Sequence, residues 1–252
     1  MTVTPAITWS TEAACTAIRL RPDVLLVRAP DGSGRLLDLA GSFYALDQIA
    51  TELLFDLARR GRTETVRAAA WRYRMSERRV AADLDALLSE LPPGLSELPP
   101  GIETPETARR GGRVDPLVVA VLSLLRRVGH PQLRAWVLLA AARVCFATAG
   151  WSRTLRWWTS LPTRGRPGGS SAAEIDVRVR RHATGSVLGH TCKERAVVCL
   201  AEARTAGLGA AVVLGLSFYP LATHSWCVLD NGVILGDYPD VCAAFQPVAL
   251  HR

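Results

Sequence analysis

The stretch Gly189-His190-Thr191-Cys192-Lys193-Glu194-Arg195 decides how the second half of this chain is interpreted. The run that follows, Glu194 to Arg204, carries apolar residues at helical spacing and is predicted as a helix. Because glycines at 185 and 189 precede this run, Cys192 is expected near the N-terminus of the helix. The helix dipole and the unpaired backbone N–H groups there favour a thiolate over a thiol. Cys192 is therefore a candidate nucleophile.

Two short segments downstream supply the partners that a nucleophilic cysteine needs. His224 lies in a strand-like run, and Asp237 lies just after the next such run. Between the two runs stands the pair Asn231-Gly232, which is typical of tight β-hairpin turns. Such a hairpin would bring Asp237 back alongside His224. A cysteine on a helix with a histidine and an aspartate on adjacent strands forms a general-base arrangement for nucleophilic catalysis.

Other residues compete for each of these roles. His190, two residues before Cys192, is a rival general base. Asp230 is a rival for the orienting carboxylate, although its place in the Asn-Gly turn favours a turn role. A cysteine considered alone is more often a small buried hydrophobe than a nucleophile, and Cys199 fits that description. The assignment of Cys192 therefore depends on the combination of residues.

The composition describes a folded protein rather than a disordered one. Of 252 residues, 49% are hydrophobic and 21% are charged, enough for a large core and two domains. The formal net charge is +7, and Lys193 is the only lysine, so arginine carries nearly all of the positive charge. Arginine suits carboxylate or phosphate partners, but nucleotide bias in the source genome explains the preference equally well.

The six cysteines, at positions 15, 145, 192, 199, 227 and 242, show neither a Cys-x-x-Cys pair nor zinc-finger spacing. No metal and no cofactor is therefore expected. Residues 1–10 lack the basic start and the apolar run of a signal peptide. The apolar run Leu133 to Gly150 is interrupted by Arg134 and Arg143, which argues against a membrane span. The sequence thus predicts a cytoplasmic protein with free thiols.

Residues 1–95 are predicted to form a first domain. Two short strands, Val24 to Val27 and Arg35 to Leu39, are joined by a segment whose Pro, Asp and Gly residues favour a hairpin turn. Three helices are predicted after them, over about Tyr44 to Arg59, Thr63 to Tyr73, and onward from a cap at Ser76. Strands followed by three helices favour a small winged helix-turn-helix.

A winged helix-turn-helix binds DNA in many proteins, but its strand and helix also suit a peptide. The arginines at 72, 74, 78 and 79 would attract phosphates, whereas acidic residues on the third helix would repel them. An exposed strand beside a helix is suited to adding a peptide strand. Two groups of residues are expected to bind such a peptide. The first is a strand expected at a sheet edge, formed by Arg35, Leu36, Leu37, Asp38 and Leu39, and the second is the pair of cations at the start of the third helix, Arg78 and Arg79. A solvated surface explains the arginines equally well.

A Pro- and Gly-rich segment separates the two halves of the chain. Leu91-Pro92-Pro93-Gly94 recurs as Leu98-Pro99-Pro100-Gly101, which cannot continue a helix, and residues 96–113 are predicted as a linker. Residues 114–252 are predicted as a second domain. It opens with two apolar helices, about Pro116 to Arg127 and Pro131 to Thr148, and ends with the Cys192 helix and several strands.

Several segments together resemble one known family. Four segments of the second half resemble the transglutaminase-like cysteine peptidase that matures lasso peptides. They are Cys192-Lys193-Glu194-Arg195-Ala196, Leu214-Gly215-Leu216, His224-Ser225-Trp226 and Asp237-Tyr238-Pro239-Asp240. The segments Leu36-Leu37-Asp38-Leu39 and Tyr44-Ala45-Leu46 resemble the precursor-recognition element that accompanies this peptidase. The chain as a whole resembles the lasso-peptide B proteins in which both parts are fused. The resemblance leaves out the linker and part of the two apolar helices.

The resemblance implies an α+β chain, with an N-terminal winged helix-turn-helix-like recognition domain followed by a transglutaminase/papain-like cysteine peptidase domain. It implies a catalytic triad of Cys192, His224 and Asp237 that cleaves the leader from a ribosomally made precursor. The implied partners are the leader region of that precursor and an asparagine-synthetase-like lasso cyclase, without nucleic acid. The chain departs from the family at Lys193 and Ala196, where Leu and Ser are common, and at Cys227, where an acidic residue commonly follows the histidine run. The alternative is a non-catalytic peptide-binding or DNA-binding winged-helix regulator with a degenerate peptidase domain.

Overall fold

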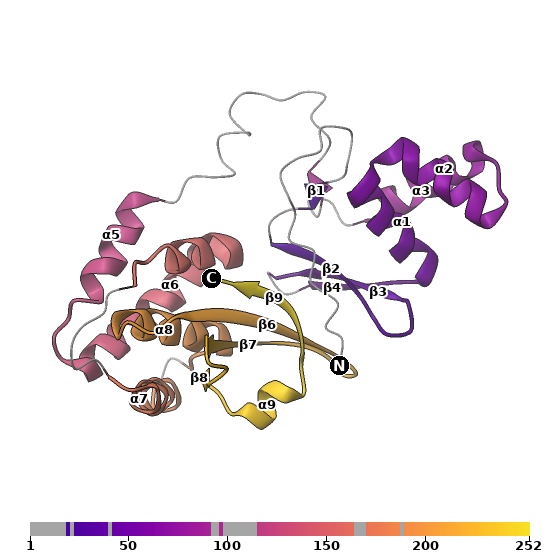
Figure 1. The fold of residues 1–252 in the computed structure, drawn as a ribbon. Helices are drawn as coiled ribbons and strands as arrows, with labels where there is room; N and C mark the ends of the chain where they lie inside the picture. The colour runs from indigo at the N-terminus through magenta and orange to yellow at the C-terminus, as the bar shows by residue number, and fades with distance from the viewer. Residues whose placement is uncertain are drawn as a thin grey trace. The chain divides into compact units, whose positions relative to one another are not determined.

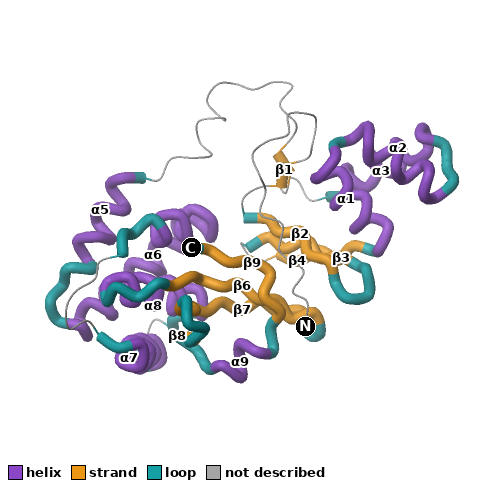
Figure 2. Tube along the Cα trace, viewed as in Figure 1, coloured by secondary structure: helices purple, strands orange, loops and turns teal. Residues whose placement is uncertain are grey.

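The computed structural model describes residues 19–20, 23–39, 42–91, 96–97, 115–163, 170–186 and 189–252. Its contacts divide the chain into two compact units, one within Ile7–Gly111 and the other containing Gly112–Arg252. Figure 1 labels the helices and strands, and Figure 2 colours them by type. Of the predicted linker, residues 98–113 lie outside the described residues. Its first two residues form strand β5 (Ser96–Glu97), which pairs with β1 (Arg19–Leu20).

The N-terminal unit contains a three-stranded antiparallel sheet in the order β2-β3-β4. Its strands are β2 (Val24–Arg28), β3 (Gly34–Asp38) and β4 (Ser42–Leu46). The turn between β2 and β3 closes with a hydrogen bond from Ala29 N to Ser33 O at 2.7 Å, and Gly32 adopts the positive φ of 85° that the turn requires. The predicted hairpin is therefore confirmed.

The structure corrects the predicted position of the peptide-binding strand. Leu36 of β3 pairs with Leu26 of β2 on one side and with Tyr44 of β4 on the other, so β3 is the central strand. The segment around Tyr44, which the sequence pattern assigns to a helix, forms the third strand instead. Because the backbone groups of β3 already pair on both sides, the prediction that Arg35 to Leu39 form a sheet edge is wrong.

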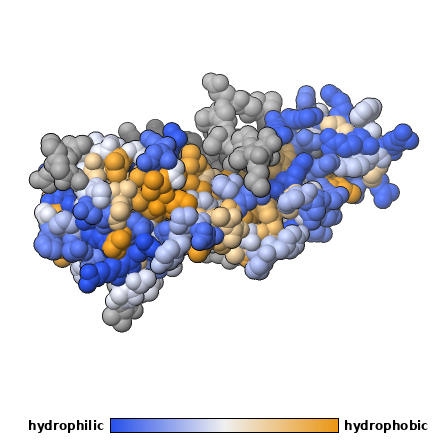
Figure 3. Space-filling view, turned by 60° about the horizontal axis from the view of Figure 1, so that its bottom comes forward, coloured by the Kyte–Doolittle hydropathy of each residue, from blue (hydrophilic) through white to orange (hydrophobic). Residues whose placement is uncertain are grey.

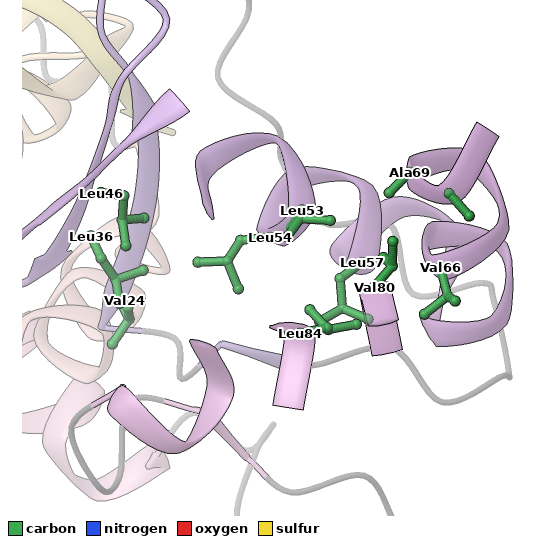
Figure 4. Close-up of a cluster of buried hydrophobic side chains, with 11 residues drawn as sticks. Val24, Leu36, Leu46, Leu53, Leu54, Leu57, Val66, Ala69, Val80 and Leu84 are labelled. Carbon is green, nitrogen blue, oxygen red and sulfur yellow. The ribbon is translucent and has the colours of Figure 1, made fainter. Parts of the chain in front are cut away.

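Three helices follow the sheet: α1 (Gln48–Arg60), α2 (Arg62–Tyr73) and α3 (Glu77–Glu90). Asp47 caps α1 by accepting a hydrogen bond from Ala50 N at 2.7 Å, and Ser76 caps α3 by accepting one from Arg79 N. Figure 4 shows the core that the sheet and helices enclose. It is built from Val24, Leu36, Leu46, Leu53, Leu54, Leu57, Val66, Ala69, Ala70, Val80 and Leu84.

The C-terminal unit is a layer of helices packed on a four-stranded antiparallel sheet in the order β8-β7-β6-β9 (Figure 1). Its strands are β6 (Ala210–Phe218), β7 (Leu221–Leu229), β8 (Ile234–Leu235) and β9 (Gln246–His251). Its helices are α5 (Pro116–Leu125), α6 (Pro131–Thr159), α7 (Ala172–Thr184), α8 (Cys192–Thr205) and the short α9 (Pro239–Ala243). Helix α8 contacts β6 and β7, while α6 and α7 pack against α8.

A buried ionic network joins the three central helices of this unit. The Glu202 side chain on α8 is fully buried and accepts from Arg134 of α6, with Nε–Oε1 at 2.5 Å and Nη2–Oε2 at 2.9 Å. Arg178 of α7 donates to the same carboxylate at 3.1 Å. Buried charges are tolerated only when paired and hydrogen bonded, so this carboxylate fixes how α6, α7 and α8 are arranged.

Helices α5 and α6 expose several large apolar side chains. Leu117 and Leu124 on α5 and Trp136 and Val144 on α6 are each more than half exposed. Figure 3 shows apolar residues grouped on the surface among charged ones. Among the described residues, α6 is the one helix whose length and composition would allow a membrane crossing, and 39% of its most apolar window is buried. Arg134 and Arg143 lie within this helix.

Candidate active site

Cys192 is the first residue of α8, which confirms its predicted position at a helix N-terminus. Thr191 precedes it in an extended conformation, and its N–H donates to Glu194 Oε2 at 2.9 Å. Gly189 turns the chain into the helix with a φ of 58°, and Arg143 of α6 donates to the Gly189 carbonyl at 3.0 Å. These contacts hold the start of α8 in place, and with it the candidate nucleophile.

His224 lies in β7, where its backbone is opposite Gly215 of β6. Its ring stacks on Phe245, at 5.0 Å between ring centroids, and on Trp226, at 6.0 Å. A Cβ atom on Gly215 would lie 2.6 Å from the Trp226 ring and 2.8 Å from Phe245 Cβ. The glycine therefore leaves the space in which two aromatic residues hold the imidazole.

Asp237 reaches His224 through the β7–β8 hairpin. Strand pairing of Cys227 with Leu235 and a turn glycine, Gly232, with a φ of 85° confirm the hairpin predicted from Asn231-Gly232. As expected from this hairpin, Asp237 Oδ2 lies 2.9 Å from His224 Nε2. The other carboxylate oxygen, Oδ1, accepts a hydrogen bond from Tyr238 N at 2.8 Å.

Gly236 sets the position of the loop just before Asp237. Its φ is 83°, and a Cβ atom there would lie 3.0 Å from Cys199 Sγ. Its N–H donates to Asp176 Oδ1 of α7 at 2.8 Å. The loop can therefore approach α8 closely because this residue lacks a side chain.

Cys192, His224 and Asp237 form one connected group. The Cys192 thiol and the His224 imidazole are hydrogen bonded. Since Nε2 of His224 faces Asp237, the ring nitrogen left for the thiol is Nδ1. The Nε2–Oδ2 pair is within contact distance, although its N–H direction is not aligned for a hydrogen bond.

The electrostatic surroundings favour charge separation between the cysteine and the histidine. Burial opposes ionisation of Cys192, but the hydrogen bond with His224, a backbone hydrogen bond from Ser225 and the charges of His224 and Arg195 offset it and lower the pKa of the thiol. The pKa of His224 is raised by its hydrogen bond with Cys192, against burial, and by the charges of Cys192 and Asp237. Both shifts favour a thiolate beside an imidazolium.

The other described cysteines lack this environment. Burial raises the pKa of Cys145, raises that of Cys199 well above its usual value, and raises those of Cys227 and Cys242 to about 12 and about 11. Cys15 lies outside the described residues. Of the described cysteines, Cys192 is therefore the one prepared for nucleophilic attack.

The rival residues have other contacts. His190 Nδ1 lies 3.0 Å from Glu194 Oε2, and its side chain is almost fully buried. Asp230 is exposed at the tip of the hairpin, where its N–H donates to Gly209 O at 3.0 Å. The structure therefore joins Asp237, and not Asp230, to His224.

The residues predicted to bind a leader belong to the other compact unit. Leu36 and Leu37 are fully buried in the central strand, and Arg35 is tied to its own turn through a hydrogen bond to Gly34 O at 2.8 Å. Arg78 and Arg79 are exposed in the first turn of α3. In the described part of the chain, no cluster of three or more His, Cys, Asp or Glu side chains could hold a metal ion.

The sequence interpretation gave no role to Arg195, which the structure places at the site. Its Nη2 atom donates to Asp237 Oδ2 at 2.7 Å. The spacing from Cys192, three residues along a helix, is the available sequence signal, because residues three apart share a helix face. The partner, 42 positions away in the chain, is not deducible from that spacing.

Comparison with known proteins finds one similarity, and it lies in the second half of the chain. Residues 135–250 match the model of the transglutaminase-like superfamily, and the match contains Cys192, His224 and Asp237. Neither the curated proteins nor the solved structures searched gave a match. The protein is thus a mixed helix-and-sheet chain with a transglutaminase-like domain.

Proposed function

We propose that this chain is a cysteine peptidase in which Cys192 is the nucleophile, His224 the general base and Asp237 the residue that orients His224. The observation that carries the proposal is the connected group itself. Cys192, whose thiol pKa is lowered, is the first residue of a helix and is hydrogen bonded to His224. His224 Nε2 in turn lies 2.9 Å from Oδ2 of the buried Asp237 carboxylate. This group lies inside the region that matches the transglutaminase-like superfamily.

The proposed reaction is hydrolysis of a peptide bond in two stages. His224 Nδ1 takes the thiol proton, and Cys192 Sγ attacks the carbonyl carbon to give a tetrahedral oxyanion. Collapse of the oxyanion breaks the C–N bond, and the imidazolium gives its proton to the leaving amine. His224 then removes a proton from water as the water oxygen attacks the thioester carbonyl carbon. Breakage of the C–S bond releases the acid and returns Cys192 as a thiolate, which recovers its proton from the imidazolium. Backbone N–H groups at the start of α8 would stabilise the oxyanion, each contributing about 2.7–4 kcal/mol in comparable sites.

We further propose that the substrate is the precursor of a lasso peptide and that the enzyme removes its leader. This proposal rests on the resemblance of the sequence segments around Cys192, His224 and Asp237, and of the segments in the N-terminal unit. The three-stranded sheet followed by α1, α2 and α3 is compatible with a winged helix-turn-helix recognition domain. An asparagine-synthetase-like cyclase is the partner proposed to act on the released core, in the reducing cytoplasm where thiols remain free.

Leader binding requires a strand that still has free backbone groups. Among the described strands, β2 and β4 are the edges of the sheet in the N-terminal unit. We favour β4, since Ser42, Phe43 and Ala45 are exposed along it and a peptide strand added there would gain main-chain hydrogen bonds. Arg78 and Arg79 remain the cations proposed to attract an acidic leader residue.

The test uses the full chain and a candidate lasso-peptide precursor, which is to be sought among the short reading frames that neighbour its gene. Cys192→Ala and His224→Ala are expected to abolish cleavage, followed by mass spectrometry, because they remove the nucleophile and the base. Both variants should still bind a fluorescently labelled leader with unchanged affinity. His182→Ala, which removes an exposed imidazole bonded to Gln132, is the matched control and should cleave normally. Normal cleavage by Cys192→Ala would refute the assignment, and binding of duplex DNA in place of the leader would favour a regulator.

A further inference from the structure

Arg195 and His224 contact the same oxygen atom of Asp237. The guanidinium donates to Oδ2 at 2.7 Å, and the imidazole Nε2 lies 2.9 Å from that atom. Arg195 follows Cys192 by three residues on α8, so one turn of helix supplies both the candidate nucleophile and a cation on the orienting carboxylate.

The Arg195 contact completes the set of groups that hold the Asp237 side chain. Tyr238 N–H donates to Oδ1 at 2.8 Å, so both carboxylate oxygens have partners. The Asp237 side chain is 7% exposed and that of Arg195 is 21% exposed, so the ion pair is largely removed from solvent. Charges in such surroundings interact more strongly than on the surface. Because Arg195 holds Oδ2 and Tyr238 N–H holds Oδ1, rotation of the carboxylate is restricted.

Gly236 allows the loop that carries Asp237 to lie close to helix α8. A Cβ atom at that position would lie 3.6 Å from the Arg195 carbonyl oxygen, close to the backbone of α8. The loop that carries Asp237 is thus seated directly on the helix that carries Arg195 and Cys192.

We propose that Arg195 is a positioning residue, which fixes Asp237 for His224 and divides the negative charge of that carboxylate between two cations. This inference rests on the proposed function, in which Asp237 orients His224. It assigns Arg195 no contact with the substrate.

Loss of the Arg195 charge has a definite effect on the two ionisations at the site. The groups that influence them are Arg195 on α8, His224 on β7, Asp237 after β8 and Cys242 on α9. The Arg195 charge lowers the pKa of the Cys192 thiol, so its removal raises that pKa and moves formation of the thiolate to higher pH. Without Arg195, the Asp237 carboxylate interacts with the His224 imidazolium alone and stabilises it more, which raises the pKa of His224 as well. Both ionisations, of the Cys192 thiol and of the His224 imidazolium, therefore move to higher pH.

The experiment measures the reactivity of Cys192 without requiring a substrate. The folded full chain is alkylated with iodoacetamide over a range of pH, and the tryptic peptide His182 to Lys193, which contains Cys192 alone among the cysteines, is quantified by mass spectrometry. Arg195→Gln is expected to move the midpoint of alkylation to higher pH and to slow alkylation several-fold at neutral pH. In Arg195→Lys the alkylation midpoint should move most of the way back toward that of the unmodified chain, since lysine returns the positive charge.

Peptide cleavage supplies the second readout. Arg195→Gln is expected to lower kcat about ten- to a hundredfold with KM nearly unchanged, because small misplacements of catalytic groups have effects of this order. Lys193→Gln is the matched control: it removes a positive charge from the same turn, where Lys193 lies over the Phe146 ring and not at Asp237. Its alkylation midpoint should equal that of the unmodified chain, measured on the peptide His182 to Arg195 because the substitution removes the tryptic site after residue 193.

An unchanged midpoint in Arg195→Gln, or an equal shift in Lys193→Gln, would overturn the inference. A rise in KM with kcat preserved would also overturn it, since that result indicates a substrate anchor. If the expected alkylation shift occurs in a chain that cleaves no peptide, the Arg195 role is supported and the peptidase proposal fails.

Discussion

Replacing Asp237 with asparagine gives the sharpest test of the proposed triad, because the structure determines how the new amide must be oriented. Tyr238 N–H donates to Oδ1, so the asparagine keeps its carbonyl oxygen at that position. The NH₂ group then takes the place of Oδ2, where it faces Arg195 Nη2 and His224 Nε2. A flipped amide would instead set its NH₂ against the Tyr238 N–H.

The substitution acts through the tautomer of His224. To accept the thiol proton at Nδ1, the neutral imidazole must carry its own proton on Nε2, facing residue 237. An NH₂ group there opposes that proton and favours the tautomer with hydrogen on Nδ1, which cannot act as the base. The corresponding change in serine proteases lowers kcat about 10⁴-fold. Because Arg195 already takes part of the Asp237 charge, we expect a loss of about 10³-fold, or about 4 kcal/mol in the activation barrier.

Steady-state cleavage of the precursor measures this effect, with circular dichroism to show that the variant is folded. Asp230→Asn is the matched control, since Asp230 is exposed in the hairpin turn and its removal leaves the His224 contact intact. Activity of Asp237→Asn within tenfold of the unmodified chain, or a larger loss in Asp230→Asn, would refute the reasoning.

Two further predictions concern stability. Glu202→Ala leaves Arg134 and Arg178 buried without their anion, and we expect a loss of about 3–5 kcal/mol in the free energy of unfolding, measured by urea denaturation. Glu174→Ala, which removes an equal charge from the exposed capping box of α7, should lose only about 1 kcal/mol; equal losses would contradict the role assigned to the network. Gly236→Ala should lose more stability than Gly232→Ala and also lose activity. Both glycines have a positive φ, with a strain of roughly 1–2 kcal/mol for alanine, but only at Gly236 does the new Cβ press on Cys199. The idea fails if the two variants cannot be distinguished.

The sequence predicted the elements whose signals are local. The glycines before Cys192 and the apolar spacing after it were sufficient to place the residue at the start of α8. Asn231-Gly232 was sufficient to fold β7 onto β8, and this hairpin brings Asp237 to His224. These features depend on backbone preferences of neighbouring residues, which a single sequence displays.

The failures came from interactions between distant segments. Tyr44 and Leu46 fit the apolar spacing of the following helix, yet Ser42–Leu46 pairs with β3 and Asp47 begins the helix after it. A short apolar segment fits either structure, and the choice is made by a partner strand. The partners of Arg195 and Glu202 were missed for a similar reason. Ion pairs between helices and loops leave no periodic signal in the sequence.

Helix α8 explains why the candidate site and the core of the C-terminal unit are linked. Its first residue is Cys192, Arg195 binds Asp237 one turn later, Cys199 lies beneath Gly236, and Glu202 near the other end binds Arg134 and Arg178. The contacts of Glu202 anchor the helix to α6 and α7, whereas those of Arg195 and Cys199 join it to the loop that carries Asp237. The distance between the thiol and the imidazole is therefore set by contacts along the whole helix. Since α8 is nearly all buried from Ala196 to Arg204, it cannot shift by a fraction of a turn without disturbing the core. In the proposed peptidase, packing along α8 keeps Cys192 in register with His224, and the proposed role of Arg195 is an electrostatic adjustment at the N-terminal end of the same helix.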